Sequence, residues 1–281
     1  MRGMIMGPSL PSTTRTALRQ LGAATAELSR STGRLATGRR ISRGGDDPAG
    51  LVSADRLRAA LSALEAESTA LQRTDRVAAT ADRSLGAVSD QLAEANGLAV
   101  RLANDGGISD AERAAVQGEI DSILSAVSRT ANATGFAGNR LLDGSATLQA
   151  SGDTLTLPNV AAGSLGETQI DGVTYHLSDI GSTGALAGDP AAQQQVVRAA
   201  ISDVASARGR IGSFQKHTVG ARRNVVSTAI AQAATAESSI RDTDFALETA
   251  RLARARIVAT AAAKAVSIAN DNQKSVLSLL G

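Results

Sequence analysis

The chain has 281 residues, a net charge of +2 and no cysteine, which excludes disulfides, thiol nucleophiles and cysteine-ligated metals. Three Phe, one Tyr and no Trp are too few aromatic rings to stack the bases of single-stranded nucleic acid, so nucleic-acid binding is not expected. The apolar content comes mainly from Ala, Leu, Val and Ile, which pack well between close helices. We therefore expect an elongated, mainly helical protein.

The first predicted helix covers residues 16–37, and Gly38 predicts its end. Its apolar residues recur every seven positions, as in a coiled-coil seam, at Leu21, Leu28 and Leu35, with a second row three residues earlier at Leu18, Thr25 and Thr32. The preceding segment, MRGMIMGPSLPS, is too short and too broken by proline for a secretory signal. We expect any export to use another route.

The segment RISRGGDDPAGL, residues 40–51, lies between two helical patterns. A calcium loop needs oxygen ligands at alternate positions over a dozen residues, and adjacent aspartates oppose phosphate binding. A corner between helices needs only a stop and a start. Gly44 and Gly45 would supply dihedrals that a helix forbids, while Asp47 would cap the next helix and Pro48 would open it.

A long helix is predicted from about residue 47 to residue 103. Seven consecutive heptads support it, and the leucines expected in the seam of a helical bundle are Leu57, Leu64, Leu71, Leu85 and Leu92. No charge-free apolar run of about 18 residues occurs, so no membrane insertion is expected.

Ser109 and Glu112 form a capping-box pattern that predicts a third helix ending near residue 130. Residues 145–188 then change character. DTLTLPNV and GVTYHLSDI alternate apolar and polar residues and predict short strands in a small β-hairpin region, the only β-like part expected. Asp189 and Pro190 repeat the cap-and-proline device and predict another helix.

The helix after Pro190 carries two heptad rows. One row is Val197, Val204, Ile211 and Val225, interrupted by Thr218; the other is Ala200, Ala207, Phe214 and Ala221. We assign Val204, Ile211 and Phe214 to the bundle seam. A last helix is predicted from near Ser239 to the end. Its apolar residues cover most of its surface, and those assigned to an assembly seam are Ile257, Val266, Ile268, Leu277, Leu279 and Leu280.

No catalytic or cofactor motif was found. His176 and His217 lack neighbouring ligands, and no nucleotide loop, zinc-protease helix or nucleophile elbow occurs. The basic run RLARARI reads as a solvated helix face or a subunit contact. We expect a structural or interaction protein with no enzyme activity, metal or cofactor.

Two stretches resemble bacterial flagellin: LSRSTGRLATGRRISRGGDDPAGLVSADRLRAAL near the N-terminus and AESSIRDTDFALETARLARARIVATAAAKAVSIANDNQKSVLSLLG at the C-terminus. NATGFAGNRLLDG also fits the family pattern. The resemblance implies that both chain ends pair as an antiparallel coiled coil in the core of the filament. It also implies an extracellular filament for swimming motility, export of the unfolded chain through the flagellar channel, and contacts with the export apparatus, a chaperone and cap or junction proteins.

Combined with the helical pattern, the resemblance predicts three parts. Residues 1–43 with 238–281 form the terminal coiled coil, residues 44–144 with 189–237 form the long-helix bundle, and residues 145–188 form a small outward segment. The hook–filament junction protein remains an alternative, because it shares the helical ends. An enzyme hosted by the same scaffold and a coiled-coil adaptor that does not polymerise are the other hypotheses.

Overall fold

The computed structural model describes residues 12–104 and 107–280, except for the side chains of Gln273 and residues 276–280. The chain divides into two compact units, Met1–Ala63 with Ile230–Gly281 and Leu64–Ala229. The three-part division of the sequence analysis remains a prediction. Residues 1–11 of the N-terminal segment, which was predicted not to be a secretory signal, lie outside the described residues.

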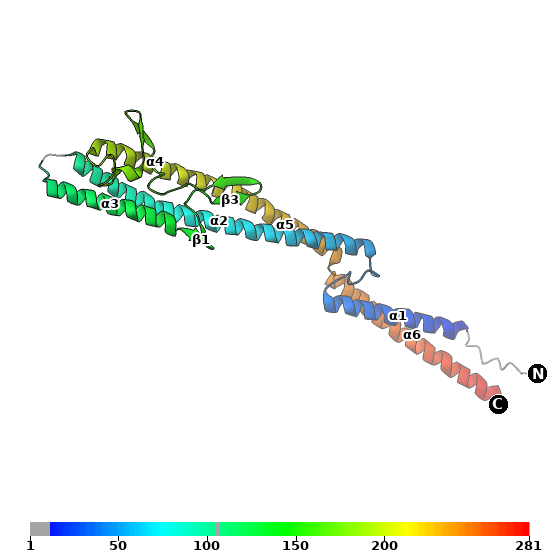
Figure 1. Cartoon of the computed structure of the whole chain (residues 1–281). Coiled ribbons are helices and arrows are strands. Elements are labelled where there is room, and N and C mark those ends of the chain that lie inside the picture. Colours follow the sequence, from blue (N-terminus) through cyan, green and yellow to red (C-terminus); the bar gives the residue numbers. More distant parts are fainter. Residues whose placement is uncertain (1–11, 105–106, 281) are drawn as a thin grey trace, which may run out of the picture. The chain divides into compact units, whose positions relative to one another are not determined.

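Six α-helices dominate the described ranges (Figure 1): α1 Ser12–Thr37, α2 Pro48–Ala103, α3 Asp110–Ala133, α4 Pro190–Ser213, α5 Gly220–Arg241 and α6 Phe245–Leu280. The predicted fold class, mainly helical with long helices from both chain ends, is confirmed. None of these helices, over the residues described, is long and apolar enough to cross a membrane.

Local capping explains where two of these helices begin. At α3, the Ser109 hydroxyl accepts from the Glu112 amide at 3.3 Å, and the Glu112 carboxylate accepts from the Ser109 amide at 2.9 Å. At α4, the Asp189 carboxylate accepts from the amides of Ala191 and Ala192 at 3.1 and 3.0 Å. Both devices satisfy amides that have no partner inside the helix.

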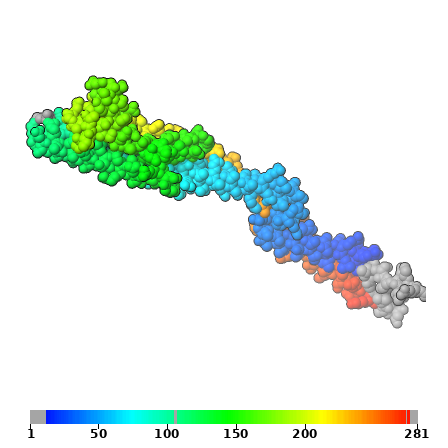
Figure 2. Space-filling model, in the orientation of Figure 1, coloured from blue at the N-terminus to red at the C-terminus, as the bar shows by residue number. Residues whose placement is uncertain are grey.

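In the described part of the chain, the named strands form three two-stranded antiparallel hairpins. They are β1 Gly135–Phe136 with β2 Asn139–Arg140, β3 Thr147–Ala150 with β4 Asp153–Thr156, and β5 Thr168–Ile170 with β6 Val173–Tyr175. The expectation that residues 145–188 hold all the β structure was wrong, because β1 and β2 precede them. Each strand pairs across a tight turn, since Gly138, Gly152 and Gly172 adopt left-handed φ angles there. Figure 2 shows the yellow-green β5–β6 hairpin standing out from its unit.

A six-residue π-helix, η2 Phe214–Val219, joins α4 to α5. Upstream, Val197, Val204 and Ile211 are buried at seven-residue spacing; downstream, the buried residues are Val219 and Val226. The predicted continuation of the row was therefore wrong, because Val225 is 57% exposed and Ala221 is also exposed. A π-turn takes up one extra residue, so the heptad phase moves forward by one.

The last helix begins at Phe245, not near Ser239 as predicted, because α5 continues to Arg241. The break at residues 242–244 is held by the segment that follows α1. The Thr243 amide donates to the Gly38 carbonyl at 2.9 Å, and the Arg40 amide donates to the Arg241 carbonyl at 2.7 Å. These bonds form a short antiparallel bridge that sequence periodicity does not reveal.

The predicted bundle seam falls in two groups. Leu71, Leu85, Leu92, Val204, Ile211 and Phe214 are buried, all in the Leu64–Ala229 unit, whereas Leu57 and Leu64 are half-buried. Polar contacts flank this core. The Arg222 guanidinium donates two hydrogen bonds to the Glu67 carboxylate, and Arg208 Nε lies 2.9 Å from Asp82 Oδ1. These bonds tie α5 and α4 to α2 along the unit.

Candidate assembly surface

Helices α1 and α6 lie side by side and antiparallel (Figure 1). Their buried contact is made mostly of small residues at seven-residue spacing: Thr14, Ala17, Ala24 and Ser31 on α1, with Glu248, Ala255 and Ala262 on α6. We call these residues the small-residue seam. Small side chains allow the two backbones to come close, so the bulkier residues flank the contact.

The predicted α1 leucines lie at the edge of this seam. Leu21, Leu28 and Leu35 are half-buried. The second predicted row, Leu18, Thr25 and Thr32, was wrong, because all three are exposed and the buried row lies one residue earlier, at Ala17, Ala24 and Ser31. Sequence reasoning favoured the larger apolar residues, whereas the close approach of α6 selects the smaller ones.

Large apolar side chains remain uncovered on this pair of helices. We call them the outer apolar set: Leu18, Phe245, Leu247, Ile257, Val258 and Ile268. Ile257 is 71% exposed and Ile268 is 60% exposed. Ile257 lies two residues beyond Ala255, about 200° around the helix, so it faces away from α1. Val266 is half-buried, and Leu277, Leu279 and Leu280 lie outside the residues whose side chains are described.

A shallow groove of about 510 Å³ follows one side of the same pair. It is lined by Gln20, Ala23, Ala24, Glu27, Arg251, Arg254, Ala255 and Val258. Two arginines of the basic run RLARARI therefore border this groove. One of them, Arg251, also pairs with Glu248.

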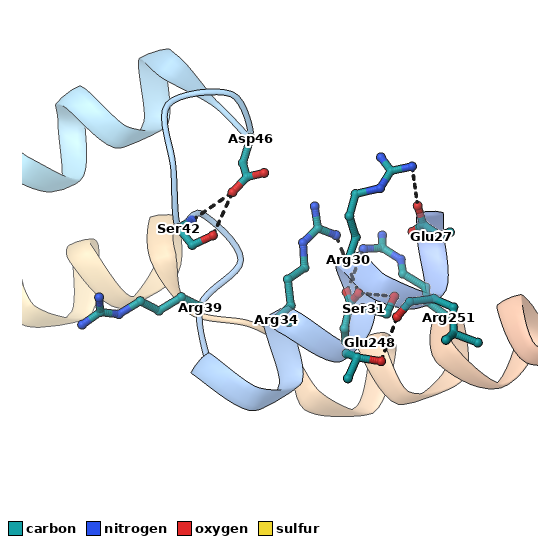
Figure 3. A network of polar contacts seen from close by, with 12 residues as sticks. Glu27, Arg30, Ser31, Arg34, Arg39, Ser42, Asp46, Glu248 and Arg251 are labelled. Atoms are coloured by element: carbon teal, nitrogen blue, oxygen red, sulfur yellow. Dashed lines mark hydrogen bonds and ion pairs between the residues drawn. The ribbon is translucent and has the colours of Figure 1, made fainter. Parts of the chain in front are cut away.

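Glu248 is the one acidic side chain that is buried among the described residues (Figure 3). Its Oε1 accepts a hydrogen bond from Ser31 Oγ at 2.7 Å, Arg34 Nη1 lies 3.6 Å from Oε1, and Arg251 Nη1 lies 3.3 Å from Oε2. Burial alone would raise the pKa of Glu248, but the Ser31 hydroxyl and the two arginines outweigh it and lower the pKa. The sequence does not reveal this group, because its partners on α1 lie more than 200 residues away.

The corner between α1 and α2 uses its two aspartates differently. Asp46 Oδ2 accepts from the Ser42 amide and hydroxyl, both at 3.1 Å, and from the Arg43 amide at 3.2 Å, which closes the loop (Figure 3). Asp47 Oδ1 accepts from the Gly50 amide at 2.9 Å, at the start of α2. The hydrogen bonds from Ser42 and Arg43 lower the pKa of Asp46, and the Ser42 amide contributes most.

The glycine requirement of this corner differs from the prediction. Neither Gly44 nor Gly45 has a left-handed φ; Gly38, directly after α1, has one of 68°. Gly50, which was not among the predicted corner residues, is crowded, because a Cβ there would force the ends of the Asp47 and Ile41 side chains to shift. Pro48 opens α2 and Pro190 opens α4. The sequence feature that could have indicated the crowding at Gly50 is its position three residues after the capping Asp47.

The histidines gain no metal partners in this structure. Over the ranges described, no three His, Cys, Asp or Glu side chains gather as a possible metal site. His217 is exposed in the π-helix, and the His176 amide donates to Asp179 Oδ2 at 2.7 Å.

Small-residue contacts within the chain and large apolar residues left outside are features of a helical subunit that associates with further copies. Comparison with known proteins identifies the family. The bacterial flagellin N-terminal helical region matches residues 12–147, and the bacterial flagellin C-terminal helical region matches residues 194–280. The chain belongs to the bacterial flagellin family and is a structural subunit of the flagellar filament, an extracellular appendage.

Relatives match over nearly the whole length. Flagellin of Bacillus subtilis is 28% identical, over 88% of this chain and 90% of that protein. Flagellin FlaB2 of Treponema pallidum is 27% identical, over 93% of this chain and 95% of that protein. The crystal structure of Bacillus cereus flagellin is 22% identical with a TM-score of 0.41, covering 58% of this chain and 86% of that chain. The family assignment rests on the sequence comparisons, and no observation favours the hook–filament junction protein.

Proposed function

We propose that the α1–α6 pair carries the contacts between copies in the filament, with the outer apolar set buried against neighbouring subunits. The observation that carries this proposal is the exposure of Ile257 and Ile268, two large side chains on a helix whose buried residues are Glu248, Ala255 and Ala262. A solvated monomer gains nothing from them. Burial of each in a lattice would contribute up to about 1.5–3 kcal/mol per subunit.

The remaining parts of the chain receive roles consistent with this core. We propose that residues 44–144 with 189–237 form the surrounding helical shell and that residues 145–188 face outward. The predicted seam leucines Leu277, Leu279 and Leu280 would extend the assembly surface along α6. As a filament subunit, the protein has no proposed catalytic role and needs no cofactor.

The same surface implies helper proteins before assembly. An apolar face that is exposed on the free subunit promotes premature association. We propose that an export chaperone shields α6, that the flagellar export apparatus carries the unfolded chain, and that cap or junction proteins receive it at the ends of the filament. The family resemblance supports these partners.

The test is the substitution Ile257→Asp, measured as the protein concentration above which filaments form. Ile257 is 71% exposed, so the folded monomer should keep its helical content. Loss of roughly 1–2 kcal/mol of burial per subunit should raise the critical concentration at least about fivefold to thirtyfold, and burying a charge should raise it further. Pelleting after seeding gives this concentration, and electron microscopy identifies the fibres.

Val173→Asp in β6 is the matched control. Val173, like Ile257, is a β-branched apolar residue with a largely exposed side chain (51% exposed), but it lies in the segment proposed to face outward. It should assemble at the wild-type concentration. If Ile257→Asp assembled at the wild-type concentration, the proposal that the outer apolar set is buried between subunits would be excluded.

A further inference from the structure

The small-residue seam by itself does not define how far α6 slides along α1. From the contact between Ser31 and Glu248, antiparallel heptads place Ala24 opposite Ala255 and Ala17 opposite Ala262. A slip of one heptad, about 10.5 Å, would place Ala262 opposite Ala24 and Ala269 opposite Ala17. Alanine would again face alanine, so these contacts are equally good in both registers.

The flanking row does not favour the observed register either. The same antiparallel spacing would pair Leu28 with Leu252 and Leu21 with Ala259 in the observed register, and Leu28 with Ala259, Leu21 with Val266 and Leu35 with Leu252 in the slipped one. All of these residues are half-buried in the structure. Leu21 would gain a larger partner while Leu28 would exchange Leu252 for Ala259, so these changes in buried apolar area offset each other and this row does not select the register.

Glu248 distinguishes the two registers. In the slipped pair, its carboxylate would lie opposite Gly38, without the Ser31 hydroxyl, while Ser31 would face Ala255. The carboxylate would keep its ion pair with Arg251, which lies on the same helix, but would lose the Ser31 hydrogen bond and its place beside Arg34. Loss of these partners by a buried carboxylate is unfavourable. Single buried polar residues set register in this way in other coiled coils, at a cost in stability.

We propose that Glu248, through Ser31 and Arg34, is the residue that determines the register of α6 on α1. The register decides which exposed residues of the two helices lie side by side on the outer face, and thus which surface a second copy meets. This inference rests on the proposed assembly role of the α1–α6 pair. The backbone bridge between Arg39 and Asp242 is the other element that opposes slippage.

Disulfide trapping can measure the register, because the chain contains no native cysteine. The pair Ala24→Cys with Ala255→Cys reports the observed register, and Ala24→Cys with Ala262→Cys reports the slipped one. Each pair is assembled into filaments with a tenfold excess of cysteine-free subunits and then oxidised. Non-reducing electrophoresis separates disulfides within one chain from those between chains.

With Glu248 intact, the observed-register pair should form disulfide at least roughly ten times more than the slipped pair. Glu248→Ala should bring the two yields to within about threefold of each other. Ser31→Ala removes only the hydrogen bond, and Glu248→Gln keeps an acceptor for Ser31 but loses the ion pairs, so both should give intermediate ratios. A control, Glu67→Ala, removes the ion pair with Arg222 in the Leu64–Ala229 unit, away from the seam and the bridge, and should leave the ratio unchanged.

An unchanged ratio in Glu248→Ala would overturn the proposal and assign the register to the backbone bridge. The readout is separate from that of the proposed function. Filament yield tests the outer apolar set, whereas the disulfide ratio within a chain tests only the register of the pair.

Discussion

Two adjacent valines test the phase shift at the π-helix. A continuous α-helical heptad would bury Val225, in line with Ile211, but the structure buries Val226 to 1% exposure and leaves Val225 57% exposed. Val226→Ala removes two buried methyl groups, at about 0.8 kcal/mol each, and leaves a small cavity. The higher helix propensity of Ala returns about 0.5 kcal/mol. The expected net loss of unfolding free energy is about 1–2 kcal/mol.

Val225→Ala should behave differently. Less than half of its side chain is buried, so the lost burial and the gained helix propensity nearly cancel, and the expected change is within about 0.5 kcal/mol of zero. Urea unfolding followed by far-UV circular dichroism, at protein concentrations below the assembly threshold, compares the two variants with the parent. Equal losses, or a larger loss for Val225→Ala, would refute the π-helical phase shift.

Deletion of His217 is an independent test of the phase shift at the π-helix. If the π-turn takes up one extra residue, removing an exposed residue inside it should convert the turn to an α-helix and keep the downstream phase. The difference between the two valine variants should then persist in the deletion background. A reversal, with residue 225 becoming the sensitive position, would contradict this account.

Two further predictions concern the corner before α2. Gly50→Ala should be less stable than Gly97→Ala by about 1 kcal/mol, because a Cβ at residue 50 forces the Asp47 side chain to shift and weakens its cap, whereas a Cβ at residue 97 meets no neighbour. Thermal unfolding compares the two variants, and equal stability would contradict the crowding at Gly50. Because the pKa of Asp46 is lowered in the folded protein, its ionised carboxylate stabilises the corner at pH values above the ordinary carboxyl pKa of 3.8. This stabilisation should be lost as the pH falls through the lowered folded-state pKa. Asp46→Asn should show a weaker acid dependence of stability, and an identical acid limb would exclude this role.

The sequence by itself determined the features that depend on neighbours within a turn or two. The long heptad row of α2 predicted Leu71, Leu85 and Leu92 in the core, where they are buried. The capping box at Ser109 also forms as predicted. Such features are readable because both partners lie within a few residues, so spacing alone brings them together.

Only the tertiary structure decided which helical face meets its partner and where a repeat changes phase. The π-helix at Phe214–Val219 moves the buried row by one residue, although the heptad pattern of the flanking residues fits an uninterrupted α-helix. The α1–α6 contact favours alanine and serine over leucine, because the distance between the two backbones limits the size of the side chains between them. That distance cannot be read from the sequence of either helix alone. Glu248 is buried for the same reason: its hydrogen-bond donor is Ser31, 217 residues away, and only folding brings the two together.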